Sequence, residues 1–285
     1  MEELWVSGGD IEAALLPSVG ARLHRLRVFG QDLLRTPGDH DAHVREPFLW
    51  GAYVMAPWCN RIEAAPVVVR GRTVALDANF PDGSAIHGQV HARPWLSDNG
   101  GELRVTAGGD GWPWTYEVIQ ALEVRGTSLQ VRLTLVNRSE APMPAGLGMH
   151  PWFRRPVLVA VRGDAVYASN TAPDARPEPV HGALDLRRIG QIPELDATWT
   201  RLADPAVELQ WPALGVAATM RVTAPTPFVV AASPPSLDAV AVEPQTHAPH
   251  GLRRLLNGEP DGLAMLDPGQ ALELRVELAF ERLQG

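Results

Sequence analysis

The hydrophobic residues of this chain recur at every second position over much of its length. Residues 129–138 read LQVRLTLVNR and residues 271–283 read ALELRVELAFERL, so aliphatic side chains alternate with polar or charged ones. Such alternation is typical of half-buried strands in antiparallel sheets. The sequence therefore predicts strands over both stretches, and over the shorter segments ELRVTA, WTYEV, VELQW and TMRVTA.

Glycine and proline punctuate the whole chain, with 26 of each. This spacing disfavours long helices and suits short strands joined by loops, and no amphipathic helix longer than two or three turns is evident. No internal repeat, low-complexity segment or domain boundary is visible. We predict an all-β fold, a large antiparallel β-sandwich that forms a single domain over residues 1–285. The long loop at residues 170–194 is a candidate for function.

Composition narrows the classes of partner. The chain has 285 residues, 45% of them hydrophobic, and a formal net charge of -8. Nucleic acids and anionic membranes attract clustered positive charge, so we expect neither as a partner. The first ten residues lack the basic and apolar regions of a secretory signal, and no run approaches the roughly 18 apolar residues of a membrane span. These features predict a soluble, cytoplasmic protein.

Two residue types exclude whole classes of chemistry. All 25 basic residues are arginine, so a lysine Schiff base and a P-loop lysine are excluded. Cys59 is the sole cysteine, so neither an internal disulfide nor a thiolate metal cage can form. Its simplest role is that of a small packing residue.

Arg61 is the first candidate binding residue, in the segment APWCNRIEAA (56–65). Its guanidinium is a rigid fork of donors that suits a sugar hydroxyl, a carboxylate or a phosphate. The ordinary alternative is a surface ion pair with Glu63 or another acid, because most arginines are solvated.

His87 and His91 lie in the next unusual segment, SAIHGQVHARPW (84–95). Gly88 permits an unusual backbone or a close approach by a ligand. In a strand the two histidines would share a face, and a zinc site would still need a third ligand. A buried histidine that bonds backbone groups is the ordinary alternative.

His150 and Trp152 lie in the segment GLGMHPWFRRP (146–156). The proline after His150 keeps its backbone extended. Aromatic rings beside a polar group suit a carbohydrate site, because sugar rings stack their C–H faces on aromatic faces. For this segment alone, core packing of Trp152 and Phe153 is an equally good interpretation.

Glu243 lies in the segment LDAVAVEPQTHAPHG, whose alternation predicts a strand that ends at this residue, before Pro244. A carboxylate at a strand's end can lie in a cleft with its pKa raised toward neutral, although a solvated glutamate at the rim is commoner. His247 and His250 have a spacing that metal ligands use. Pro249 lies between them and the H-E-x-x-H pattern is absent, so the metal signal is weak.

In their order along the chain, the motifs NRI, IHG, HPWF and VEPQTHAP resemble those of the aldose 1-epimerases, the galactose-mutarotase-like enzymes. The segments LLPSVGARLHRLRVFGQDLL and ELDATWTRL are similar to family segments too, so the resemblance covers roughly the whole chain. Each motif is short, but four in the right order and spacing are much more specific. The resemblance implies a large β-sandwich with a curved sheet that holds the sugar.

The resemblance also implies roles for particular residues. Glu243 matches the general base and His150 the general acid. His87 and Arg61 match residues that hold the sugar near its ring oxygen, and Asp196 matches an aspartate that binds sugar hydroxyls. The chain departs from the family pattern at two places that bear on sugar preference. Trp152, expected to bind substrate, stands where tyrosine is usual, and His250 stands where an aspartate is often seen.

The expected function is therefore that of an aldose 1-epimerase acting on a hexose, as a monomer or a homodimer. No metal and no cofactor are expected, because no electron moves and no group is transferred. Three alternatives stay open: a hexose-6-phosphate 1-epimerase with Arg154 and Arg155 near the phosphate, a non-catalytic carbohydrate-binding protein on the same scaffold, and a metal-dependent sugar isomerase that uses His87, His91 and Glu243.

Overall fold

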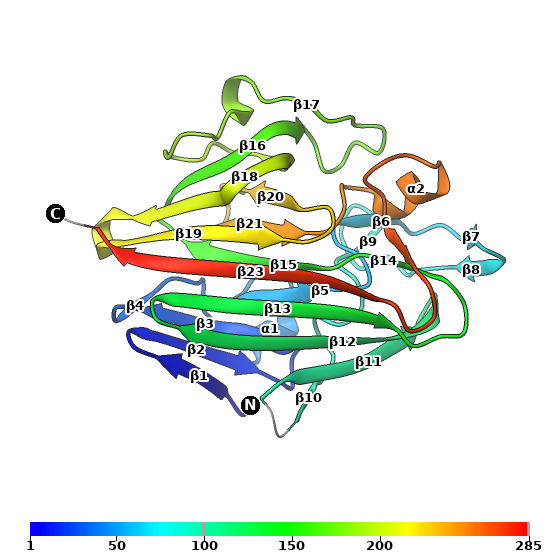
Figure 1. Cartoon of the computed structure of the whole chain (residues 1–285), viewed down its shortest axis with the longest axis horizontal. Coiled ribbons are helices and arrows are strands. Elements are labelled where there is room, and N and C mark those ends of the chain that lie inside the picture. The colour runs from blue at the N-terminus through cyan, green and yellow to red at the C-terminus, as the bar shows by residue number, and fades with distance from the viewer. Residues whose placement is uncertain (99–100, 284–285) are drawn as a thin grey trace.

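Strands dominate the computed structural model, which describes residues 1–98 and 101–283 (Figure 1). Within these residues, 17 strands form one curled sheet, and all of its strand pairs are antiparallel. The predicted all-β fold is confirmed. The helical elements are short: α1 (Ala42–Arg45), α2 (Gly251–Leu256), and the 3-10 turns η1 (Gly182–Leu184) and η2 (Pro212–Leu214). In the described part of the chain, no helix is both long and apolar enough to cross a bilayer.

The sheet has two runs of strands. Adjacent strands in one run, which Figure 1 shows side by side across its centre, are β11 (Leu103–Gly109), β12 (Trp112–Arg125), β13 (Ser128–Asn137), β23 (Ala271–Arg282) and β19 (Val216–Thr223), with β10 (Leu96–Ser97) beside β11. Adjacent strands in the other run are β1 (Leu4–Gly8), β2 (Ile11–Leu16), β3 (Arg22–Val28), β5 (Ala52–Met55), β15 (Gly148–Arg154), β21 (Ala239–Gln245) and β20 (Phe228–Ala232).

The long strand β18 (Asp196–Trp211) joins the two runs. Its first part pairs with β20 and its last part with β19, so the sheet curls back over itself as a two-layered sandwich. β16 (Leu158–Tyr167) pairs with β18 along most of its length. The remaining pairs are short: β3 with β4 (Gln31–Asp32), β16 with β17 (Glu178–Pro179), β6 (Arg61–Glu63) with β9 (Ser84–Ile86), β7 (Val67–Val69) with β8 (Arg72–Val74), and β14 (Met143–Ala145) with β22 (Ala264–Leu266).

The predicted alternation is realised in the central strands. On β13 and β23 every second side chain is buried between the layers, and the register places Leu133 opposite Leu274. Burial of such aliphatic side chains contributes roughly 25 cal/mol per Å² of apolar surface, which makes this seam a main source of stability. The core residues of the two strands are Leu129, Val131, Leu133, Leu135, Leu272, Leu274, Val276, Leu278 and Phe280.

Strands β5, β15 and β21 differ because both of their faces are covered by protein. Val54, Phe153 and Val242 face the core between the layers. The alternate positions on the other face carry larger or polar side chains, and these line a cavity: Tyr53, His150, Trp152 and Glu243. The sheet thus separates a packing face from a chemical face on the same three strands.

The predicted end of the strand at Glu243 is wrong, because β21 continues through Pro244 to Gln245. Glu243 pairs with Val230 of β20, and Gln245 pairs with Phe228. A proline has its φ fixed near −65°, which an extended strand tolerates, so Pro244 does not interrupt the pairing on either side. Glu243 is therefore held within a strand, rather than at its loose end.

Candidate active site

The register of three adjacent strands brings Tyr53, His150 and Glu243 into one row. His150 pairs directly with Tyr53. The pairing of Gly148 with Gln245 and of Trp152 with Ala241 sets His150 opposite Glu243 as well. The His150 Nε2 and Glu243 Oε1 atoms are 3.1 Å apart, and the Tyr53 ring stacks on the His150 ring with centroids 4.6 Å apart. An imidazole and a carboxylate are thereby fixed side by side on rigid elements.

A cavity of about 800 Å³ opens in front of this row. Its size falls within the range of small-molecule sites, roughly 300–1,000 Å³. Its walls are partly aromatic, with Phe48, Phe80 and Trp152 among the lining residues. All six residues predicted to act in the site line this cavity: Glu243, His150, Arg61, His87, Asp196 and Trp152.

His87 enters the cavity from a tight turn after β9. Its own φ is +61° and that of Gly88 is +73°. A Cβ on Gly88 would lie 2.0 Å from the Ala56 carbonyl oxygen, so only glycine fits at this close approach. The backbone N–H of Asn60 donates to His87 Nδ1 over 3.2 Å. This bond assigns the proton of the neutral ring to Nε2, which leaves His87 with one N–H donor for a ligand.

Arg61 and Asp196 lie at the rim of the cavity. Arg61 Nε donates to Asp82 Oδ2 over 2.7 Å, and its Nη1 is 3.7 Å from Asp196 Oδ2. The predicted alternative, an ion pair of Arg61 with Glu63 or another acid, is realised with Asp82, whereas Glu63 pairs with Arg253. Asn170, at the start of the predicted functional loop, donates to Asp196, whose side chain is 42% exposed. Arg61 is thus oriented by acids yet still reaches the cavity.

Burial sets the protonation of the central pair. It raises the pKa of Glu243 well above its usual value, and the nearby charge of Asp196 adds to this while Arg61 opposes it. Burial also lowers the pKa of His150 to about 3. Both shifts disfavour the charged forms, the Glu243 carboxylate and the His150 imidazolium. Both groups are therefore neutral, and one proton lies between Glu243 Oε1 and His150 Nε2, which are 3.1 Å apart. Among the described residues, Glu243 Oε2 has no hydrogen-bond partner.

Tyr53 is a cavity residue that no motif of the sequence singles out. Its hydroxyl is buried and finds no hydrogen-bond partner in the described part of the chain. Burial raises the pKa of Tyr53 well above its usual value, so the hydroxyl keeps its proton and can donate to a ligand. In the sequence it is one aromatic residue in the apolar stretch AYVM, and only the register with His150 reveals its position.

The alternative metal set of His87, His91 and Glu243 is not among the groups of close ligand atoms in the described part of the chain. The chain from 87 to 93 forms bends and turns rather than a strand, and both histidine rings lie near Phe48 and Tyr53. His91 lies outside the cavity lining, with its ring against that of Phe48. His150 instead joins His87 and Glu243, with ligand atoms within 4.8 Å of one another. A metal on His87 Nε2 would move the ring proton to Nδ1, against the Asn60 N–H that now donates to it.

His247 and His250, the two histidines that follow Glu243 in the sequence, do not line the cavity. His247 is buried, its Nε2 accepts the Cys59 backbone N–H over 2.9 Å, and its Nδ1 bonds the Ala248 carbonyl over 2.7 Å. Both of its nitrogens are therefore used within the protein, which agrees with the weak metal signal. His250 adopts a left-handed backbone, with φ +56°, as the residue before α2. Cys59 is buried and takes the packing position expected of it.

The chain matches the sequence model of the aldose 1-epimerase family over residues 6–278. It is 25% identical over 250 residues to the uncharacterized protein YphB of Escherichia coli, with 81% of this chain and 84% of that protein covered. A galactose mutarotase-like protein from Clostridium acetobutylicum has a TM-score of 0.84 at 16% identity, covering 98% of this chain and 95% of that chain. Galactose 1-epimerase from Lactobacillus acidophilus has a TM-score of 0.80 at 16% identity, with 99% and 95% covered. At such identities the two structures establish the fold, which is galactose mutarotase-like.

Proposed function

The chain belongs to the aldose 1-epimerase family, and we propose that it interconverts the α and β anomers of an aldohexose by acid–base opening and reclosure of the sugar ring. One observation carries this proposal: His150 Nε2 and Glu243 Oε1 lie 3.1 Å apart on the floor of the cavity. The hydroxyl that loses a proton and the ring oxygen that gains one are bonded to the same carbon, C1. A base and an acid that serve both must therefore stand side by side.

Ring opening begins with Glu243 ionised and His150 protonated. Glu243 removes the proton of the C1 hydroxyl, the C1–O5 bond breaks, and its electron pair takes the proton of His150. The products are the open-chain aldehyde, protonated Glu243 and neutral His150, so atoms and charge balance. General acid–base groups each contribute typically about 10²–10⁴-fold to such a step.

The shared proton explains how the pair can be buried and still react. In the resting state the proton lies on Glu243, because burial raises the pKa of that carboxyl and lowers the pKa of His150. The reactive state differs only by the shift of one proton along the 3.1 Å contact. The pair carries no net charge in either form, so neither form leaves an isolated charge inside the protein.

Reclosure uses the same two groups in exchanged roles. After rotation about the C1–C2 bond, His150 takes the proton of the C5 hydroxyl as O5 attacks the other face of C1. Glu243 returns its proton to the former carbonyl oxygen. The enzyme regains its starting state, and the chemistry needs neither a redox cofactor nor a transferred group.

The other cavity residues hold the sugar in this proposal. His87 donates from Nε2 and Arg61 from its guanidinium toward the ring oxygen, where charge develops during the reaction. Asp196 accepts hydrogen bonds from sugar hydroxyls at the rim. Trp152 offers an aromatic face, with its indole N–H already committed to the Phe48 carbonyl over 2.6 Å. Tyr53 donates its free hydroxyl to the sugar.

A hexose 6-phosphate is the second candidate substrate, and Arg155 is the observation that favours it. Arg155 lines a smaller hollow of about 480 Å³ that shares Glu194, Pro235, Ser236 and Leu237 with the main cavity. Glu194 and Asp238 line the same hollow, however, and two carboxylates repel a phosphate. We therefore favour a free hexose as substrate.

Anomer exchange measured on a panel of aldoses, free and 6-phosphorylated, tests the proposal. We expect the wild-type chain to accelerate the change in optical rotation of freshly dissolved α-glucose or α-galactose, and the line broadening of exchanging anomers in NMR. Sugar binding in calorimetry without any acceleration would replace the proposal with a non-catalytic carbohydrate-binding protein. Acceleration confined to the phosphorylated sugars would move it to the second candidate.

A further inference from the structure

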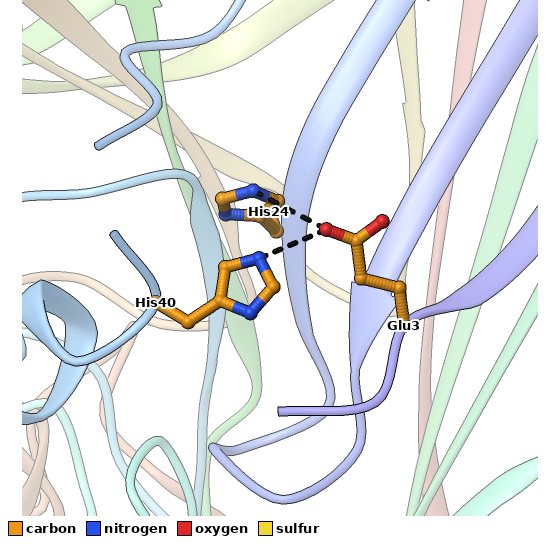
Figure 2. Close-up of side chains that lie close together, drawn as sticks. All are labelled: Glu3, His24 and His40. Atoms are coloured by element: carbon orange, nitrogen blue, oxygen red, sulfur yellow. Dashed lines mark hydrogen bonds and ion pairs between the residues drawn. The ribbon is translucent and has the colours of Figure 1, made fainter. Parts of the chain in front are cut away.

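A second cluster of two histidines and a glutamate lies outside the cavity, near the start of the chain (Figure 2). Glu3 precedes β1, His24 lies on β3, and His40 lies in the segment before α1. Figure 2 shows both imidazoles directed at the same carboxylate oxygen. Glu3 Oε1 is 2.9 Å from His40 Nε2 and 3.7 Å from His24 Nε2.

These separations suit a tetrahedral zinc ion. Zinc bonds to nitrogen and oxygen are about 2.0–2.2 Å long, so two ligand atoms around one ion lie roughly 3.4 Å apart. The two measured separations, 2.9 and 3.7 Å, lie on either side of that value, and all three ligand atoms are within 4.8 Å of one another. Only small side-chain rotations are needed to surround an ion.

The surroundings hold the ligands in place before any ion binds. His24 Nδ1 is 2.8 Å from Nε2 of the buried His43, so His24 can carry its proton on Nδ1 and present the lone pair of Nε2. Histidine ligands of metals almost always donate their other N–H in this way. His40 is anchored by its backbone, since its carbonyl accepts the His43 N–H over 3.1 Å.

The cluster is also open to solvent on one side. The side chains of Glu3 and His40 are 23% and 26% exposed, whereas that of His24 is 3% exposed. An ion could therefore enter from water and keep a water molecule as its fourth ligand, as zinc sites with three protein ligands do.

We propose that Glu3, His24 and His40 form a binding site for one Zn²⁺ ion, completed by water. The ion joins the segment before β1 to β3 and to the loop before α1, three parts that are distant in sequence. It acts as a clip that stabilises this end of the sheet, and it takes no part in the acid–base chemistry of the cavity, because none of its three ligands lines that cavity.

Titration of the tag-free, metal-stripped full chain with Zn²⁺ in a calorimeter tests the site. We expect one ion per chain, and visible absorption bands of a tetrahedral complex when Co²⁺ is used instead. His40→Ala and Glu3→Gln each remove the binding. His43→Asn leaves the three ligands in place but weakens affinity about 10–100-fold, as loss of a partner of a metal-bound histidine usually does.

Two matched variants locate the site. His181 forms an exposed pair with Glu178 at 3.4 Å, and His181→Ala should leave zinc binding unchanged. Glu243→Gln, which alters the cluster in the cavity, should leave it unchanged too. The proposal is overturned if the wild-type chain binds no zinc, if His40→Ala binds it as tightly as wild type, or if Glu243→Gln abolishes it. Circular dichroism and thermal melts of each metal-free variant establish that a loss of binding is not a loss of fold.

Discussion

Residues 1–98 and 101–283 contain two clusters with the same composition, each of two histidines and one glutamate with ligand atoms within 4.8 Å. The cavity cluster is His87, His150 and Glu243, and the N-terminal cluster is Glu3, His24 and His40. In the cavity cluster the side chains of His150 and Glu243 are only 6% and 3% exposed. In the N-terminal cluster those of His40 and Glu3 are 26% and 23% exposed. Residue types alone therefore do not decide the chemistry.

Hydrogen bonds to the histidines make the difference. The Asn60 N–H occupies Nδ1 of His87, which leaves a proton on Nε2 and turns that ring into a donor. His43 Nε2 lies 2.8 Å from Nδ1 of His24, so His24 can carry its proton on Nδ1 and offer the lone pair of Nε2 to an ion. A histidine that donates beside a buried carboxylate suits a sugar. Two histidines beside a partly exposed carboxylate suit a cation, which would take the place of the proton that His40 Nε2 donates to Glu3 Oε1.

The largest expected effect is on the rate of anomer exchange, which substitutions in the cavity cluster should lower and a substitution in the N-terminal cluster should not. Glu243→Gln and His150→Asn should each slow anomer exchange by about 10²–10⁴-fold, because each removes a general acid–base group. His40→Ala, in the N-terminal cluster, should keep the wild-type rate. Polarimetry at saturating sugar measures all three variants.

Two outcomes would contradict the roles assigned to the cavity cluster and to the N-terminal cluster. A wild-type rate in Glu243→Gln or His150→Asn would remove that residue from the mechanism. A slow His40→Ala variant with an intact fold would mean that the N-terminal cluster serves catalysis after all.

The next effect is on stability, and its sign follows from the raised pKa of Glu243. Burial raises the pKa of Glu243 above the value of about 4.3 expected in the unfolded chain, so its contribution is fully present below that pH. The contribution is lost as the pH rises through the raised pKa of the folded state. Glu243→Gln does not titrate, so it should gain stability relative to wild type as the pH rises across this window. Urea unfolding of both proteins from pH 4 to pH 8 measures the difference.

Glu259 supplies a control of opposite sign. Hydrogen bonds from Arg176 and Asn257 lower the pKa of Glu259 to about 2. Its contribution is therefore present above the pKa of the unfolded chain and is lost as the pH falls through the folded value. Glu259→Gln should be less stable than wild type at neutral pH, with a difference that shrinks in acid. A gap between Glu243→Gln and wild type that does not widen with pH would contradict the buried, proton-sharing pair.

Removal of Zn²⁺ by a chelator should lower the stability of the protein without changing its rate of anomer exchange, which distinguishes the N-terminal cluster from the cavity cluster. A ligand at 100 times its dissociation constant stabilises the folded state by about 2.7 kcal/mol, so removal of Zn²⁺ should lower the Tm by several degrees. The rate of anomer exchange should not change, because the proposed chemistry uses no metal. Differential scanning calorimetry and polarimetry on the same samples, with and without EDTA, test both halves. A loss of activity that zinc restores would place a metal in the mechanism.

The fold was predictable because it rests on local alternation. The strands around Leu133 and Leu274 follow from their period of two, and the motifs at Arg61, His87 and His150 carry their family resemblance within a few residues each. The structure confirms the all-β sandwich and gathers the six predicted residues around one cavity. Their catalytic and binding roles, the single domain, the cytoplasmic location and the oligomeric state remain predictions.

What the sequence did not reveal depends on contacts between distant segments. Asp82, the partner of Arg61, lies 21 residues away, and the N-terminal cluster combines positions 3, 24 and 40 with no motif among them. Tyr53 becomes a cavity residue only through the register that sets it opposite His150. The sequence predicts a strand end before Pro244 because a proline is locally a strand breaker, whereas pairing of Glu243 and Gln245 with β20 continues the strand past it.

The smallest expected effect concerns the free hydroxyl of Tyr53. It has no hydrogen-bond partner among the described residues, so we expect it to bond the sugar. Tyr53→Phe should then lower kcat/KM about fivefold, since a hydrogen bond contributes a net of about 1 kcal/mol, while the free energy of unfolding stays unchanged or rises. Tyr116 serves as the control, because its hydroxyl donates to Gln89 Oε1 over 3.1 Å and the residue does not line the cavity. Tyr116→Phe should lose about 1 kcal/mol of stability and no activity, and the same result for both tyrosines would show that Tyr53 does not touch the substrate.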